Sequence, residues 1–195
     1  MSDRPFHHGN LRSALLERAE SVLRDRGLDA LSLRELARDL GVSHGAPRSH
    51  FVDRQALLDA LAERGFDRLA HAMREAAQTH ADDVYDSLVA AAHAYVDFAV
   101  RDAALVDLMF ARHLDEAAAG VQAAAGRFFA TIRELVGTWM AALDGDDIER
   151  MSLLISATMQ GIATFTAAGR VGPAQSDELI RDAVNGFLRS GHRRT

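Results

Sequence analysis

The 195-residue chain has no cysteine and no lysine, and only three prolines. The absence of cysteine excludes disulfides, thiolate metal sites and thiol nucleophiles, and it removes any argument for an oxidising compartment. No apolar run reaches the roughly 18 uncharged residues that a membrane-spanning helix needs, and the N-terminal residues MSDRPFHHGNLR lack the apolar segment of a signal peptide. We therefore expect a cytoplasmic protein without a membrane span.

Strand signals are also nearly missing, because β-branched residues rarely alternate with polar ones along the chain. Apolar residues make up 48% of the sequence, which is enough to bury a sizeable core. They recur at helical spacing, beginning with Leu15, Ala19 and Val22 ahead of Gly27, so we predict an all-α fold. After three N-terminal helices, the predicted helices occupy residues 53–80, 83–101, 103–112, 116–143, 146–168 and 176–190.

Residues 32–51 combine a short amphipathic helix, a turn and a second short helix, which is the helix-turn-helix pattern. Ser32 and Glu35 have the spacing of a capping box, in which each side chain bonds the other residue's free backbone amide. Gly41 ends this helix, and we expect Ser43 to cap the next one. The second helix, HGAPRSH, has no apolar stripe, so we expect its polar groups to face outward, within reach of bases and phosphates.

The charge is unevenly distributed. The whole chain has a formal net charge of −6, but residues 1–54 carry nine arginines against eight carboxylates, whereas residues 55–195 carry thirteen against twenty. The acidic total disfavours an overall nucleic-acid-binding surface, so any contact with DNA is expected in the N-terminal portion.

Residues 6–66 resemble the TetR family of bacterial transcriptional regulators without a gap. The resemblance is carried by LSLRELARDLGVS at residues 31–43, by HF at residues 50–51, and by Arg54, the basic residue before ALL at residues 56–58. It implies a three-helix helix-turn-helix DNA-binding domain at residues 1–53 and a helical domain for ligand binding and dimerisation at residues 54–195. It also implies a ligand-responsive homodimer that binds palindromic double-stranded operator DNA in the major groove and acts as a repressor, with activation as the alternative.

The resemblance implies which positions touch DNA: Arg34 a base or phosphate, His50 and Arg54 the phosphate backbone, and the displayed helix the base edges. The alternatives are a solvated surface arginine for Arg34 and a packed histidine beside Phe51 for His50. Arg48 stands where most relatives carry tyrosine, and because arginine can bond both acceptors of a guanine, we predict a guanine in each operator half-site. The predicted DNA-contacting residues are Ser32, Arg34, Ser43, His44, Gly45, Arg48, Ser49, His50 and Arg54.

The C-terminal portion resembles only loosely the subgroup whose eighth helix carries a Trp, His and Gly signature. In SATMQGIATF, Ser156 and Gln160 replace the first two of these residues and Gly161 is kept. The helix at 146–168 has apolar residues on one face and small residues on another, so it can be packed from two directions. Together with the helix at 176–190 it can form a two-fold four-helix dimer interface, as the family does.

Large, adaptable side chains in the C-terminal portion are candidates for lining a ligand pocket, and ordinary core packing is the alternative for each of them. A mostly apolar pocket with few polar groups suits a modest-sized organic ligand. The predicted ligand-contacting residues are Phe98, Met109, Phe110, His113, Phe128, Trp139, Thr158, Met159 and Phe165.

No reactive constellation indicates an enzyme. His113 and Glu116 share one helical face, but no second histidine pair with metal-type spacing accompanies them. We therefore predict no catalytic site, no metal and no cofactor. The competing function is a helical dimer that binds a small molecule or a protein partner and has lost DNA recognition through the changes at Pro47, Arg48 and Ser49.

Overall fold

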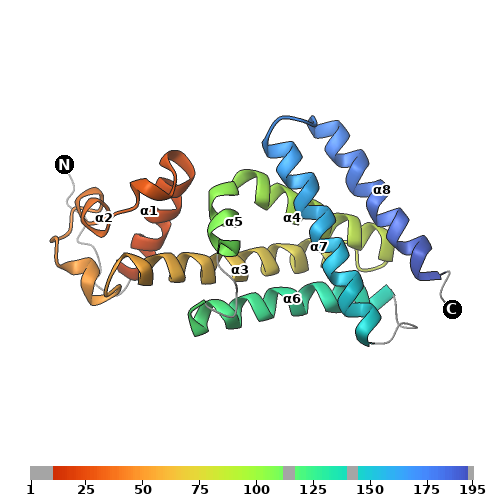
Figure 1. Cartoon of the computed structure of the whole chain (residues 1–195), viewed down its shortest axis with the longest axis horizontal. Helices are drawn as coiled ribbons and strands as arrows, with labels where there is room; N and C mark the ends of the chain where they lie inside the picture. Colours follow the sequence, from red (N-terminus) through yellow and green to blue (C-terminus); the bar gives the residue numbers. More distant parts are fainter. Residues whose placement is uncertain (1–10, 112–116, 140–144, 193–195) are drawn as a thin grey trace. The chain divides into compact units, whose positions relative to one another are not determined.

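A computed structural model describes residues 11–111, 117–139 and 145–192, the side chains of residues 139 and 190–192 excepted. These residues form eight α-helices and two short 3-10 helices, and no strand occurs among them, which confirms the predicted all-α fold (Figure 1). None of the helices that lie in these ranges is both long enough and apolar enough to cross a membrane.

The helices follow the periodicity of the sequence closely. Each segment predicted beyond residue 80 coincides with an observed helix, although the ends predicted at residues 112, 116 and 143 lie outside the described residues. The last helix begins three residues early, at Pro173, because the first position of a helix needs no backbone N–H. In chain order the elements are α1 (Leu11–Arg26), η2 (Leu28–Ala30), α2 (Leu33–Asp39), η3 (Ala46–Ser49), α3 (Arg54–Gln78), α4 (Val84–Arg101), α5 (Ala103–Phe110), α6 (Ala119–Trp139), α7 (Gly145–Ala167) and α8 (Pro173–His192).

The chain divides into two compact units that are each discontinuous in sequence. The first comprises residues 1–65 and 104–122, and the second comprises residues 66–103 and 123–195. The division falls inside α3, whose first twelve residues belong to one unit and the rest to the other. The functional boundary between residues 53 and 54 stays a prediction.

The core of the first unit is built on the apolar stripe of α1. Leu15, Ala19 and Leu23 are buried, and α1 packs against η2, α2 and η3. Gly27 ends α1 with a φ of 76°, a left-handed conformation that a residue with a Cβ rarely adopts. At the surface beside this core the Arg18 guanidinium donates two hydrogen bonds to one carboxylate oxygen of Asp39, at 3.0 and 2.8 Å, so that α1 holds the end of α2.

The second unit packs α4 against both α7 and α8, which also pack against each other. Its centre is aromatic: the rings of Phe66 and Phe128 lie 5.7 Å apart, and Tyr95 stacks on Phe128 at 6.3 Å. The Asp83 carboxylate accepts a hydrogen bond from the Asp86 amide at 3.0 Å and so caps α4. Residues from α3, α4 and α6 thus form the aromatic centre of the unit.

Two predictions about the helix-turn-helix are wrong in detail. Ser32 is the N-cap of α2 but makes no side-chain bond there, and Glu35 instead pairs with Arg26 and Arg38 at 3.3 and 3.6 Å, so the capping box does not form. The second helix is not capped by Ser43: it is a single 3-10 turn that starts after Gly45.

The shortness of η3 follows from its sequence. Gly45 weakens the first turn, and Pro47 has no N–H with which to continue an α-helical ladder. The bonds that form are those of a 3-10 turn, from the Ala46, Arg48 and His50 amides to carbonyls three residues earlier, at 3.0 to 3.1 Å. Pro47 and Phe51 are buried and hold the turn on the core, which leaves the residues between them at the surface.

Candidate nucleic-acid interface and internal pocket

The first unit has a concave surface formed by the start of α2, the η3 turn and the segment that leads into α3. Six of the nine residues predicted to contact DNA line it: Ser32, Arg34, His44, Gly45, Arg48 and Arg54. Sequence reasoning missed four others that complete its wall: Leu31, Leu33, Val52 and Asp53. Val52 is 78% exposed, and its place between the buried Phe51 and the cap residue Asp53 is the only signal in the sequence that marks it.

Two cations on this surface are available to a ligand. Arg34 and Arg48 are exposed, and no carboxylate lies within ion-pair distance of either one among the residues that the structure describes. Nearby arginines differ, because Arg18 and Arg38 are both engaged by Asp39. Unpaired guanidinium groups at a surface are suited to phosphate oxygens and to the two acceptors of a guanine edge.

Arg54 has a structural task that the sequence did not reveal. Its Nε donates to the Leu31 carbonyl at 3.0 Å and its Nη2 donates to the Leu28 carbonyl at 2.6 Å. The start of α3 is thereby attached to η2 and to the residue that precedes Ser32. Asp53 supports the same corner, because its carboxylate accepts a hydrogen bond from the Ala56 amide at 2.8 Å and so caps α3.

The other three predicted DNA contacts lie outside the concave surface. Ser43 and His50 are exposed on the flanks of η3, so the packed alternative for His50 does not hold. Ser49 is also exposed, but its hydroxyl donates to the Ala46 carbonyl at 2.7 Å and keeps only its acceptor lone pairs for another partner. The structure therefore separates a clustered set of candidate contacts from a peripheral set.

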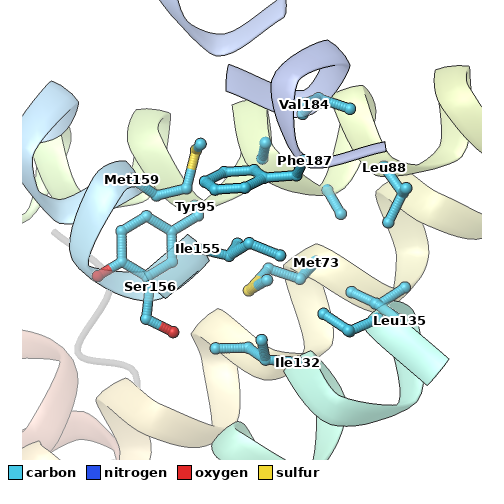
Figure 2. Close-up of a pocket in the computed structure, with 13 residues that line it drawn as sticks. Met73, Leu88, Tyr95, Ile132, Leu135, Ile155, Ser156, Met159, Val184 and Phe187 are labelled. Carbon is cyan, nitrogen blue, oxygen red and sulfur yellow. The ribbon is translucent and has the colours of Figure 1, made fainter. Parts of the chain in front are cut away.

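An internal pocket of about 50 Å³ lies in the second unit, where α3, α4, α6, α7 and α8 converge (Figure 2). Of the residues predicted to contact a ligand, Met159 lines it. The walls also come from positions that sequence reasoning did not select, among them Met73, Tyr95, Ser156 and Phe187. On α4 the lining residues Leu88, Ala91, Ala92 and Tyr95 repeat at helical spacing, a signal that any core face would also produce.

The remaining predicted ligand contacts lie elsewhere. Phe98 and Phe128 are core residues of the second unit, the first between the guanidinium groups of Arg68 and Arg101, and Met109 is buried in the first unit beside Gly65. Phe110 and Phe165 are 39% and 48% exposed, and Thr158 is half-buried with its hydroxyl donating to the Leu154 carbonyl. His113 and the side chain of Trp139 lie outside the described residues.

No group of three or more His, Asp or Glu side chains within the described ranges could hold a metal ion. The only large pKa shift among the groups at the pocket belongs to Tyr95, whose pKa is raised by burial. A neutral phenol in an apolar pocket and unpaired arginines on a separate surface suggest binding functions rather than a reaction.

Comparison with known proteins identifies the family. The family profile described as "Bacterial regulatory proteins, tetR family" matches residues 15–61, and the one described as "Tetracyclin repressor-like, C-terminal domain" matches residues 88–187, which is half of the chain. The chain belongs to the TetR family of bacterial regulatory proteins. Its N-terminal helices are the family's DNA-binding helix-turn-helix domain, and its C-terminal helices are the domain that follows it. The family consists of regulators and not of enzymes, as predicted for this chain.

Solved and curated relatives agree with this membership. A solved structure of a protein of unknown function from Rhodococcus sp. RHA1 is 43% identical, with a TM-score of 0.85 over 96% of this chain and 98% of that one. The class C tetracycline repressor of Escherichia coli is 46% identical over 52 residues, 27% of this chain and 24% of that protein. The transcriptional activator FasR of Mycolicibacterium smegmatis is 34% identical over 99 residues, 51% of this chain and 45% of that protein. The chain thus aligns with less than half the length of these two curated relatives, one a repressor and the other an activator.

Proposed function

We propose that this TetR-family protein is a homodimeric repressor that acts in the cytoplasm, binds a near-palindromic operator through the major groove and releases it when a small organic molecule binds the second unit. The observation that carries the DNA-binding part is the clustering of Arg34, His44, Gly45 and Arg48 on one concave surface. Because Pro47 is buried, its presence does not alter the exposed face of η3. Arg48 is as well suited to contact DNA as the tyrosine that most relatives carry at this position.

The roles proposed on this surface differ in a measurable way. Arg48, on the exposed side of the η3 turn, reads a guanine, whereas Arg34, at the start of α2, neutralises a phosphate. A phosphate contact contributes equally to every sequence and steepens the dependence of affinity on salt, while a base contact discriminates at one position.

The test is a fluorescence-anisotropy titration of a labelled promoter fragment from the neighbouring genes at several salt concentrations. Arg34→Ala should weaken binding to all sequences and lower the salt slope by about one, and Arg48→Ala should relax specificity at one position by roughly 1–3 kcal/mol. Arg133→Ala is the charge-matched control, because it removes an exposed arginine of the second unit. A uniform loss of affinity in Arg48→Ala would make that residue a phosphate contact.

Dimerisation is supported by the exposed face of α7. Leu153 and Leu154 are 56% and 52% exposed, and the small residues Ala157 and Gly161 lie exposed one and two turns further along. An apolar face with small residues allows a second copy of the helix to approach closely. A two-fold dimer also suits DNA, because recognition elements about 34 Å apart reach successive major-groove faces.

Sedimentation velocity tests the dimer. Leu154→Glu should produce monomers at micromolar concentration, because two carboxylates would face each other across a two-fold axis. Val84→Glu is the matched control, since Val84 is 48% exposed at the start of α4. If Leu154→Glu remains a dimer, the α7 face is not the interface.

The response to ligand is supported by the path of α3. This helix supplies Met73 to the pocket, and it begins at Arg54, which lines the concave surface of the first unit. A ligand that favours a state with mismatched DNA-binding units by a few kcal/mol suffices to release DNA.

The competing function is a dimer that binds a small molecule or protein partner without DNA. In that case the protein should not bind the promoter fragment even at low salt. Neither Arg34→Ala nor Arg48→Ala should then change the anisotropy of the labelled fragment. Saturable binding with a steep salt slope would reject this alternative.

A further inference from the structure

The pocket of the second unit contains two polar groups whose hydrogen atoms are already used. The Tyr95 hydroxyl donates to the Gln160 side-chain oxygen at 2.7 Å, and the Ser156 hydroxyl donates to the Ser152 carbonyl at 2.7 Å. In Figure 2 both oxygens lie on the same side of the view, and Leu88 and Leu135 lie on the other. We call the part of the lining that carries these two oxygens the polar end of the pocket.

What the polar end can offer follows from the chemistry of a hydroxyl group. Each hydroxyl has one donor hydrogen and two acceptor lone pairs, so the two groups retain acceptor capacity only. No Asp, Glu, Arg or His side chain is among the described residues that line the pocket, and burial raises the pKa of Tyr95, which keeps its hydroxyl neutral. The side chains that line the pocket thus carry two oxygens, both neutral acceptors, and are otherwise apolar.

We propose that this pocket takes an uncharged, mainly apolar molecule that carries a hydrogen-bond donor at one end, an alcohol or a phenol being the simplest members of the class. The proposal rests on the ligand response proposed above and specifies its chemistry. A hydrogen-bond donor on the ligand can bond the hydroxyl oxygen of Tyr95 or Ser156. An ether or a ketone has only acceptor atoms, which cannot bond to these oxygens. Carboxylates and ammonium ions are excluded, because a charge would lose its hydration with no opposite charge in the wall.

The size of the pocket restricts how such a molecule enters. At about 50 Å³ it is far smaller than a typical ligand site of roughly 300–1,000 Å³, so side chains must move apart. Met73 and Met159 line it, and methionine is the side chain that adapts most readily to a new neighbour. The two methionine methyl groups therefore report on binding directly.

The experiment compares 1-hexanol with its isomer methyl pentyl ether, which differs in the donor and not in the number of atoms. Hexanoate and hexylammonium at pH 7.4 are the charged counterparts. Binding to the full-length protein is followed by NMR of ¹³C-methyl-labelled methionine. The signals of Met73 and Met159 should shift, and that of Met109, which is buried in the first unit, should not.

We expect 1-hexanol to bind about 3- to 10-fold more tightly than the ether, the effect of about one hydrogen bond, and the two ions to bind at least roughly 30-fold more weakly. The Tyr95→Phe/Ser156→Ala double variant should bind both isomers equally. Ala92→Leu, which fills the pocket, should bind neither, while Ala94→Leu on the half-buried side of the same helix should bind as the wild type does.

Equal affinity for the two isomers in the wild type, or preferred binding of hexanoate, would overturn the proposal. This outcome is separate from a failure of the proposed function, because the DNA titration is made without any ligand. Ala92→Leu serves both tests: it should bind the promoter fragment as the wild type does, and 1-hexanol should no longer weaken that binding.

Discussion

Replacement of Arg54 by alanine tests whether this residue supports the DNA-binding surface or forms part of the contact with phosphate. Its guanidinium bonds two backbone carbonyls, those of Leu28 and Leu31. A hydrogen bond from a charged donor contributes about 1.5–3 kcal/mol, and the exposure of Arg54 reduces this. We expect Arg54→Ala to lower the free energy of unfolding by about 1–2 kcal/mol and the melting temperature by roughly 2–8 °C.

Urea and thermal unfolding followed by circular dichroism measure the loss. Amide hydrogen exchange should also accelerate in residues 27–33, which contain both carbonyl partners. Arg54→Lys should restore only part of the stability, since an ammonium group lacks the planar fork that bridges two acceptors. Arg34→Ala is the control, and its stability should stay within about 0.5 kcal/mol of the wild type.

The structural role of Arg54 would be refuted by a variant that unfolds like the wild type. If Arg54→Ala also lost affinity for all DNA sequences with a salt slope lower by about one, Arg54 would be the phosphate contact that the family resemblance implies. The structural role would be confirmed if Arg54→Ala lost stability but kept the salt slope of DNA binding unchanged, measured at a temperature where the variant is folded.

Three further predictions concern residues with one clear environment each. The pKa of Asp39 is lowered, chiefly by the hydrogen bond from Arg18, so the stability difference between wild type and Asp39→Asn should be constant above pH 5 and should shrink as the pH falls below the ordinary value of 3.8; a difference that grows in acid would contradict this. Phe128→Ala should cost about 3–5 kcal/mol in urea unfolding, because its ring is 1% exposed at the centre of the second unit. Gly45 has a φ of −86° and open space where a Cβ would lie, so Gly45→Ala should raise stability by about 0.4–1 kcal/mol and should weaken DNA binding in the anisotropy assay if the backbone of Gly45 approaches the bases.

Much of the fold could be read from local patterns. The apolar stripe of α1 and the end of that helix at Gly27 each depend on a few neighbouring residues, and both were predicted where the structure has them. The error at η3 arose where two local rules competed, because Ser43 is a good cap but Gly45 and Pro47 weaken the turn that it would have capped.

The candidate sites were predictable to different degrees. Arg34 and Arg48 lie on a short segment whose exposed side follows from the buried Pro47 and Phe51, so local sequence and family resemblance located them. Among the described residues predicted to line the pocket, only Met159 does so. A buried aromatic residue such as Phe98 or Phe128 has the same sequence pattern whether it faces a cavity or another side chain, so the sequence could not separate the two cases.

The helices, the family and the exposed segment of the helix-turn-helix could therefore be predicted from sequence, since each of these depends on residues within one or two helical turns or on a contiguous motif. Two features emerged only from the packed structure: Arg54 donates to two carbonyls more than twenty residues away, and Tyr95 of α4 and Ser156 of α7 line the same pocket. Side-chain partners between helices depend on how those helices pack, and packing distances do not appear in the periodicity of any single helix.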